Sequence, residues 1–246
     1  MLYNCTNNLE QFMKKKAIYI ILSVFLVLSV ALNVVQLTKR GNGTLKFSDY
    51  VYSVVEVKAS TEDVGESFGT AEFINSNGVL VTNAHVITYK KMGVVYTFEN
   101  VSVRFSFEND YHKVSIVKFD TTKDVAVLQL DDTSLNFKPL KMGDSSKLNY
   151  NQEIFAIGNL NNLGLSITKG IISNPSLNVT YEDNTRNVIQ CDLTIADGNS
   201  GGALLDNTGK LVGLTTFRLK DNKGNVIYGI AYCIPINTIL EYIENV

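Results

Sequence analysis

A chain of 246 residues has room for one domain of about 200 residues and a short additional segment. Hydrophobic residues make up 45% and charged residues 19% of it, which is typical of a globular protein and argues against intrinsic disorder. The formal net charge of −2 argues against a nucleic-acid partner, because nucleic acids are usually bound by a basic surface.

The cysteines and histidines are too few for a metal centre or a disulfide framework. The chain contains Cys5, Cys191, Cys233, His85 and His112, and no pair of them has a metal-ligand spacing. We therefore expect neither a metal nor any other cofactor. Cys191 and Cys233 could pair only if the fold brought them together, and two buried thiols are the simpler expectation.

The first element in chain order is an apolar segment that follows three lysines at positions 14–16. About 20 apolar residues span a bilayer core of about 30 Å as a helix. We assign residues 17–37 to a transmembrane helix, residues 1–16 to the cytoplasmic side and residues 38–48 to a linker. More basic residues precede the segment than follow it, which predicts a single-pass protein of the cell membrane whose remainder lies outside the cytoplasm.

A cleaved signal peptide is the alternative interpretation of this segment. Ser29 and Ala31 provide small residues at the spacing of a cleavage site. The apolar run continues past Ala31, however, which favours an uncleaved anchor. A buried helix of a soluble domain fits less well, because no polar residues line one face of the segment.

From residue 49 onwards the sequence predicts many short strands separated by turns. Asn77-Gly78 is typical of a two-residue hairpin turn, since both residues tolerate positive φ angles. Strands at intervals of about 8–12 residues predict a sandwich or barrels rather than a parallel α/β sheet. A short helix is expected at residues 236–245. The expected strands are 69–74, 79–82, 101–107, 114–119, 125–130, 153–157, 167–172, 188–193, 203–205, 211–217 and 226–234.

The segment Gly198-Asn199-Ser200-Gly201-Gly202 carries the densest chemical signal. Its glycines allow a tight turn that exposes the serine hydroxyl and directs nearby N–H groups to one point. Alone, this segment would fit a surface turn equally well. The same pattern occurs in α/β-hydrolases, but their histidine follows the serine. Here both histidines precede Ser200, so the order His, Asp, Ser is that of chymotrypsin-like enzymes.

His85 is the better candidate for a general base. It lies where an apolar strand enters a loop, whereas His112 lies in a polar turn and is expected to be solvated. Asp124 directly precedes an apolar strand, so its carboxylate can point inward and hold an imidazole in one tautomer. The alternative acids, which also fit turn or edge positions, are Asp131, Asp132 and Asp192.

Six sequence blocks together resemble the HtrA/Deg family of trypsin-like serine proteases, from about residue 69 to residue 235. Three of these blocks contain His85, Asp124 and Ser200. Six blocks in the order of the family are far more specific than any one of them. They are residues 81–87 (VTNAHVI), 124–128 (DVAVL), 156–159 (AIGN), 168–173 (TKGIIS), 198–202 (GNSGG) and 229–235 (GIAYCIP).

The resemblance implies an all-β protease domain over residues 49–246, formed by two six-stranded antiparallel barrels at about 49–145 and 146–235. The active site would lie between the barrels, with His85, Asp124 and Ser200 as the catalytic triad. The backbone N–H groups of Gly198 and Ser200, assisted by Asn199, would form the oxyanion hole.

Two features depart from the usual pattern of the family. Asp197 stands where most members have proline, and a carboxylate that pointed inward would weaken the oxyanion hole, so we expect it to face solvent. The chain stops at Val246, so we expect no peptide-binding PDZ domain.

The expected specificity pocket is neutral and small. In trypsin-like folds its floor comes from the position six residues before the nucleophile, which is a threonine here. A neutral floor cannot pair with Lys or Arg, so we expect cleavage after Ala, Val, Thr or similar residues. The predicted pocket residues are Thr194, Leu214, Thr215, Thr216 and Ala231, and its walls are expected from residues 193–197 and 214–216.

The sequence thus predicts a membrane-anchored serine endopeptidase that acts on unfolded polypeptides in protein quality control or processing at the cell surface. Members of the family often form trimers, so a homotrimer is compatible with the resemblance. Two alternatives stay open: a catalytically inactive binding module on the same fold, and an esterase with the same triad.

Overall fold

The computed structural model describes residues 2–39, 45–181, 184–218, 223 and 226–244 of the chain. The chain divides into two compact units, residues 1–43 and residues 44–246.

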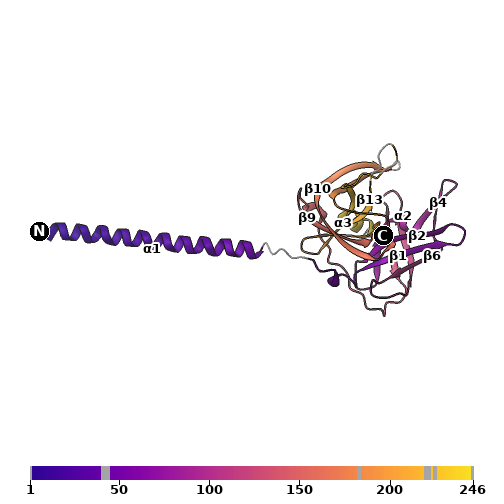
Figure 1. Ribbon diagram of the computed structural model, residues 1–246, viewed down its shortest axis with the longest axis horizontal. Coiled ribbons are helices and arrows are strands. Elements are labelled where there is room, and N and C mark those ends of the chain that lie inside the picture. Colours follow the sequence, from indigo (N-terminus) through magenta and orange to yellow (C-terminus); the bar gives the residue numbers. More distant parts are fainter. Residues whose placement is uncertain (1, 40–44, 182–183, 219–222, 224–225, 245–246) are drawn as a thin grey trace. The chain divides into compact units, whose positions relative to one another are not determined.

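The N-terminal unit contains one continuous helix, α1 (Leu2–Lys39) (Figure 1). Its apolar stretch Met13–Asn33 has 21 residues, enough by length and composition to cross a bilayer, and its side chains are exposed. This stretch overlaps most of the expected span at residues 17–37. The helix extends two residues into the expected linker, of which residues 40–44 lie outside the described part of the chain.

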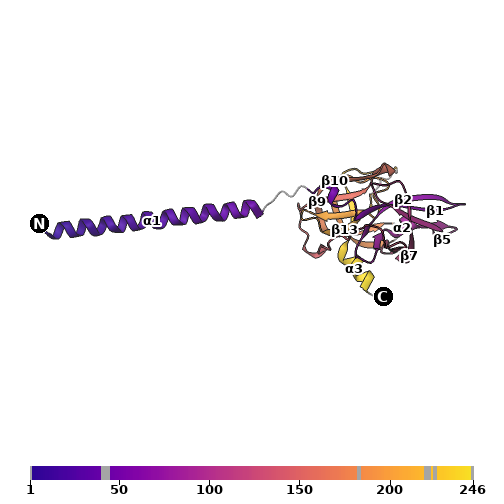
Figure 2. The ribbon, with the colours of Figure 1, turned by 90° about the horizontal axis from the view of Figure 1, so that it is seen from below.

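The second unit contains two closed barrels of six antiparallel strands each, which lie side by side (Figures 1 and 2). The expected all-β fold with two barrels is thereby confirmed. The first barrel has the strand order β1-β2-β3-β8-β7-β6 and the second β10-β11-β14-β13-β12-β9. Their bounds are β1 Val54–Thr61, β2 Gly65–Phe73, β3 Val79–Thr82, β6 Asn100–Arg104, β7 His112–Asp120, β8 Val125–Leu130, β9 Glu153–Asn159, β10 Leu165–Tyr181, β11 Asn184–Asp192, β12 Ala203–Asp206, β13 Leu211–Phe217 and β14 Ala231–Pro235.

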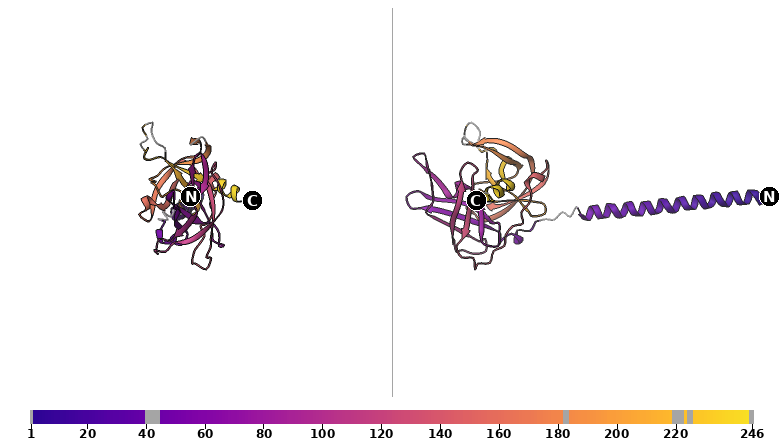
Figure 3. Two further views of the ribbon diagram at one scale, coloured as in Figure 1. Left: turned by 90° about the vertical axis from the view of Figure 1, so that its right-hand side faces the viewer. Right: turned by 180° about the vertical axis from the view of Figure 1, so that it is seen from behind.

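Short elements connect and cover the barrels. The α2 helix (Ala84–Ile87) leads into a separate two-stranded hairpin, β4 (Thr88–Lys91) and β5 (Val94–Thr97), which the sequence did not predict. Single 3-10 turns form at η1 Phe47–Asp49, η2 Ser145–Lys147 and η3 Leu160–Asn162. The expected C-terminal helix is α3 (Ile236–Glu244), which lies at the periphery in Figures 2 and 3.

Several local expectations were wrong. Strand β1 was not among the expected strands, and β14 begins at Ala231 rather than at residue 226. Two further differences have a visible cause. Five residues, 74–78, separate β2 from β3, because the Asn75 side chain accepts hydrogen bonds from the N–H groups of Asn77 and Val79 and closes a wider loop than the two-residue turn. Strand β10 has 17 residues rather than six, because shifts in register after residues 172 and 174 carry it past Pro175. A proline in a strand is tolerated at such irregularities.

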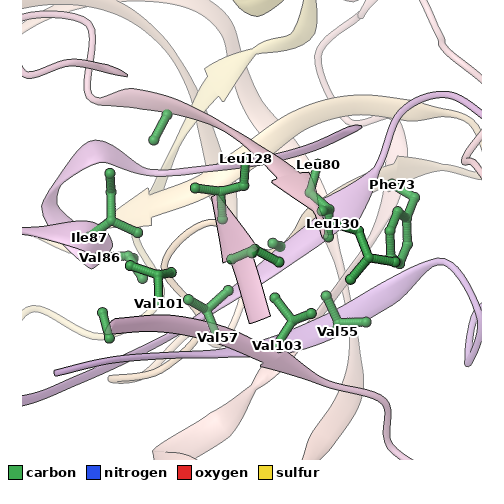
Figure 4. Packing of buried hydrophobic residues seen from close by; sticks show 14 of the residues in the cluster. Val55, Val57, Phe73, Leu80, Val86, Ile87, Val101, Val103, Leu128 and Leu130 are labelled. Carbon is green, nitrogen blue, oxygen red and sulfur yellow. The ribbon is translucent and has the colours of Figure 1, made fainter. Parts of the chain in front are cut away.

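The two faces of β1 pack into different cores. Val55 and Val57 point into the first barrel, where an entirely apolar cluster fills the interior (Figure 4). Val54 belongs to a second cluster, which joins the barrels through residues such as Ile157 and Leu214. A third cluster fills the second barrel and contains Cys191 and Cys233. Every strand of the two barrels is therefore anchored by buried apolar side chains, which fixes the ends of the strands where the candidate site lies.

Candidate active site

A cavity of about 720 Å³ opens at the junction of the two barrels. The first barrel and the adjoining hairpin contribute His85, Asp124 and Tyr89 to its lining, and the second barrel contributes Ser200 and Thr216. Residues 85, 124 and 200 are far apart in the sequence, so only the fold brings them to one cavity.

His85 and Asp124 are joined by short hydrogen bonds. The imidazole Nδ1 of His85 lies 2.8 Å from Oδ2 and 3.0 Å from Oδ1 of Asp124, and the backbone N–H of His85 donates to the same Oδ1 at 3.0 Å. An ionised carboxylate only accepts hydrogen bonds, so Nδ1 carries the proton. The neutral ring then keeps Nε2 unprotonated and able to accept a proton.

Asn83 connects this pair to the second barrel, a role that the sequence analysis did not assign. Its Nδ2 donates to the carbonyl of Asp124 at 2.8 Å and to the hydroxyl of Thr216 at 3.2 Å. Its Oδ1 accepts the N–H of Gly201 at 2.7 Å. Asn83 is fully buried. A polar residue two positions before His85 in an otherwise apolar segment was the available signal.

The loop around Ser200 depends on glycines. Gly198 and Gly201 have φ angles of +89° and +80°, and a Cβ on Gly198 would collide with the carbonyl of Asn159. The first barrel holds this loop through Thr70, whose hydroxyl donates to the carbonyl of Gly198 at 2.9 Å. The Thr70 N–H donates to the carbonyl of Ser200 at 2.9 Å, so both barrels fix the position of the serine.

The Ser200 hydroxyl donates to the carbonyl of Thr216 at 3.1 Å. Rotation about its Cα–Cβ bond would direct Oγ elsewhere in the cavity without moving the backbone.

Two backbone N–H groups of the loop are available to a ligand. The N–H of Asn199 donates to the carbonyl of Ala196 at 3.1 Å, whereas no acceptor in the described chain receives the N–H of Gly198 or of Ser200. The carbonyl of Asp197 accepts the N–H of Asn161 at 2.7 Å. In a planar trans peptide the next N–H points the opposite way, so the Gly198 N–H is directed away from Asn161. The N–H of Asn199, in contrast, is used in a hydrogen bond within the loop.

The Asp197 carboxylate faces solvent, with 94% of its side chain exposed, and pairs with the Nη2 atom of Arg218 at 2.7 Å. This orientation is the one expected from the sequence. Because Arg218 neutralises the carboxylate, little negative charge acts on the nearby N–H groups.

The expected pocket residues lie in several places: Thr216 lines the cavity, together with residues 195–197 of the expected wall, whereas the other four named residues do not. Thr194 is exposed and accepts a hydrogen bond from Thr168, while Leu214 packs between the barrels. Thr215 is buried and donates to the carbonyl of Asn199. Ala231 lies in the core of the second barrel.

The physical reason is that β13 is buried on both faces, so its side chains become accessible only where the strand ends. Other residues of the second barrel line the cavity there but were not expected from the sequence. These are Asn184, Arg186, Phe217, Arg218 and Val226.

The other histidine and the alternative acidic residues considered from the sequence occupy structural positions in the fold. His112 lies 2.7 Å from Glu108 through Nε2, Asp131 accepts from Ser115, and Asp132 accepts from the N–H and hydroxyl of Ser134. Asp192, an exposed residue, ends strand β11.

Cys191 and Cys233 are buried free thiols. A hydrogen bond with Cys191 and burial raise the pKa of the Cys233 thiol well above its ordinary value, which makes it unreactive. Among the described residues, no three His, Cys, Asp or Glu side chains gather as metal ligands would.

Comparison with known proteins agrees with this geometry. The family model for the trypsin-like peptidase domain matches residues 69–214 of this chain. A probable serine protease do-like of Buchnera aphidicola is 31% identical over 207 residues, which cover 81% of this chain and 39% of the relative. The periplasmic serine endoprotease DegP of Escherichia coli is 32% identical over 174 residues, which cover 70% of this chain and 34% of the relative.

Among solved structures, the HtrA-type protease AlgW with tripeptide superimposes with a TM-score of 0.68 and 28% identity, over 81% of this chain and 63% of that one. The chain thus spans less than half the length of the curated relatives that it matches.

Proposed function

Because the chain belongs to the HtrA-type branch of the trypsin-like peptidase family, we propose that it is a serine endopeptidase with His85, Asp124 and Ser200 as its catalytic triad. The observation that carries the proposal is the hydrogen-bonded pair of His85 and Asp124, which shares one cavity with Ser200.

In the proposed reaction, Ser200 turns from the carbonyl of Thr216 and His85 Nε2 removes its hydroxyl proton as Oγ attacks the peptide carbonyl. The imidazolium then gives this proton to the leaving amine, the peptide C–N bond breaks, and the acyl-enzyme remains. Water, deprotonated by His85, releases the acyl group and restores the hydroxyl. Asp124 keeps the imidazole in the tautomer that these steps require.

The free N–H groups of Gly198 and Ser200 are the proposed donors to the tetrahedral oxyanion. We do not extend this role to the backbone of Asn199, because its N–H already serves the carbonyl of Ala196. The ion pair of Asp197 with Arg218 supports the proposal, since it removes a competing charge.

For the substrate, we propose an extended, unfolded polypeptide that is cleaved after small, mostly apolar residues. The support is the neutral surface of Ile195, Ala196 and Phe217 along the cavity. The two acidic side chains of the lining, Asp124 and Asp197, already face His85 and Arg218. Mass spectrometry of a digested unfolded proteome tests this, and a dominant preference for Lys or Arg would contradict it.

For location, we propose that α1 anchors the protease domain on the outer side of the cell membrane, where it acts in protein quality control or processing. The exposed apolar stretch Met13–Asn33 supports an anchor, and the relative in Escherichia coli is named periplasmic. Carbonate extraction and protease digestion of intact cells test the topology. A soluble form that begins near residue 32 would favour the cleaved signal peptide.

For assembly, we propose a homotrimer. The support is the family resemblance and the partly exposed aromatic rings of Tyr52, Phe107 and Tyr111. Light scattering of the full chain in detergent measures the oligomeric state, and a monomer at micromolar concentration would contradict this part.

The central experiment is digestion of casein by the full chain in a mild detergent, together with fluorophosphonate labelling. We expect labelling and cleavage by the natural chain and neither by Ser200→Ala. Labelling without cleavage would indicate an esterase, and the absence of both would indicate an inactive binding module.

A further inference from the structure

We infer that Arg186 is a positioning residue of the second barrel, which holds the turn of the first barrel that presents Asp124 to His85. This inference rests on the proposed triad and goes beyond it, because Arg186 contacts neither His85 nor Ser200 in the structure.

Two hydrogen bonds carry the inference. Arg186 lies near the start of β11, and its Nε donates to the carbonyl of Thr122 at 2.6 Å. Its Nη2 donates to the carbonyl of Thr121 at 2.9 Å. These two carbonyls belong to the exposed turn between β7 and β8, which continues through residue 123 directly into Asp124. The guanidinium therefore connects the two barrels at carbonyls two and three residues before the proposed catalytic acid.

The same turn is held from its other side by Asp120. Its Oδ1 accepts the N–H groups of Thr122 at 2.8 Å and of Lys123 at 2.9 Å. Burial alone would raise the pKa of Asp120, but the hydrogen bonds from Lys123 and Thr122 outweigh it and hold that pKa below its ordinary value. The Asp120 carboxylate thus accepts hydrogen bonds from the N–H groups of the turn, while the Arg186 guanidinium donates hydrogen bonds to its carbonyls.

Asp124 needs this support because of its backbone. Its φ angle is +58°, in the left-handed region that side chains rarely adopt. From this conformation its carboxylate contacts both the N–H and the Nδ1 of His85 within 3.0 Å. Displacement of a reactive group by about 1 Å can cost about 100-fold in rate, so a loosened turn would be felt in catalysis.

The geometry also explains why arginine suits this position. A planar guanidinium presents donors in a fixed fork and can satisfy two successive carbonyls, whereas a lysine ammonium is a single flexible point donor. Arg186→Lys should therefore keep the charge but lose much of the constraint.

Direct contact with the substrate is the competing explanation, because Arg186 also lines the cavity. Three variants of the full chain distinguish substrate contact from positioning of the turn: Arg186→Ala, Arg186→Lys and Asp120→Ala. Asp120 is not among the residues that line the cavity, yet it holds the same turn. Lys169→Ala is the matched control, because it removes an exposed, ion-paired cation from the same barrel away from the cavity.

We expect Arg186→Ala to lower kcat by roughly 10- to 100-fold with KM within about twofold, and Asp120→Ala to reproduce this pattern more weakly. Arg186→Lys should restore only part of the rate, and Lys169→Ala should match the natural chain. The low-field proton resonance of the Nδ1–H between His85 and Asp124 should broaden or disappear in Arg186→Ala.

A raised KM with unchanged kcat, or an Asp120→Ala variant with full activity, would overturn the positioning role. An unchanged resonance in Arg186→Ala would overturn it as well. If the natural chain were no more active than Ser200→Ala, the proposed function would fail instead, and the resonance would still test the position of Asp124.

Discussion

Strands β1 and β2 present two buried faces with opposite chemistry. The face inside the first barrel carries mainly apolar side chains, among them Val55, Val57 and Phe73 (Figure 4). The face that looks toward the second barrel carries Glu56, Thr70 and Glu72 at alternate positions of the same strands. Both faces exclude water to a similar degree, so the difference between them does not arise from exposure.

The difference shows what each face contributes. Apolar packing inside the barrel is not directional, so it stabilises the fold without fixing any one atom. Hydrogen bonds between the barrels are directional, and they converge on the candidate site. Thr70 contacts the carbonyl of Gly198, and Asn83 contacts Asp124 and Gly201. The interior therefore supplies stability, whereas the face between the barrels combines an apolar cluster with the hydrogen bonds that fix position.

Glu72 is the exception on that face. Both of its carboxyl oxygens are buried without a hydrogen-bond partner among the described residues. Its cross-strand neighbours Val54 and Val81 belong to the apolar cluster between the barrels. Glu56, by contrast, forms an ion pair with Arg104 at 2.7 Å and accepts a hydrogen bond from the side chain of Asn159.

The largest expected effect concerns the residues that the polar face positions. Ser200→Ala, His85→Ala and Asp124→Asn should each lower kcat by roughly 10⁴-fold or more, with the fold intact, because each removes one function of the triad. Peptide hydrolysis and circular dichroism measure the two properties. His112→Ala is the control, and it should stay within a few-fold of the natural chain. An active His85→Ala with an inactive His112→Ala would show that the base was wrongly assigned.

A cavity in the apolar interior should act on stability alone. Leu130→Ala removes a fully buried side chain at the end of β8 far from Asp124 and should lower the free energy of unfolding by about 2–5 kcal/mol. Urea denaturation of the full chain in detergent measures this. The folded fraction should keep kcat within about twofold, and a larger loss of kcat would contradict the separation between the two faces.

Removing the connection between the barrels should act on both properties. Asn83→Ala leaves the Asp124 carbonyl without its side-chain donor and removes one of the two acceptors of the Gly201 N–H, which also bonds to the carbonyl of Thr215, so the free energy of unfolding should fall by about 1–3 kcal/mol. It should also lower kcat more than Leu130→Ala does, since Asp124 loses an anchor. Thr82→Val is the matched control: it removes a buried hydroxyl bonded to Thr70 and should leave kcat closer to that of the natural chain.

Replacing the unpaired carboxyl should have the smallest effect, and it should be stabilising. Glu72→Leu removes a buried group without partners, so we expect the free energy of unfolding at neutral pH to rise by about 1–3 kcal/mol. Glu56→Leu should have the opposite sign, because it leaves the Arg104 guanidinium without its carboxylate.

The pH dependence of the free energy of unfolding gives a second test of the role of Glu72. Burial raises the pKa of Glu72 well above its ordinary value, so the folded chain retains a proton that the unfolded chain releases. The contribution of Glu72 to stability is thus complete below the ordinary pKa and declines as pH rises toward the raised pKa. Glu72→Gln should abolish this decline in a urea series from pH 4 upward. A slope equal to that of the natural chain would show that Glu72 is ionised or solvated in the folded state.

Much of the fold could be predicted from the sequence, because strands have a local signature. Alternation, turn residues and length predicted most strands of both barrels and the C-terminal helix within a few residues. The hairpin at residues 88–97 was missed, since Lys90 and Lys91 interrupt its apolar pattern. The extent of β10 was missed because Pro175 is a local signal against a strand.

The sequence by itself determined the candidate catalytic residues: the segments around His85, Asp124 and Ser200 are recognisable because their residue types and order are local properties. Only the tertiary structure decided what surrounds them. Alternation indicates that a face of a strand is buried, but it does not tell what the face packs against, so Leu214 and Thr215 were assigned to a pocket rather than to the interior. The contacts of Asn83 and Arg186 join segments more than 40 positions apart, and no local pattern records such pairs.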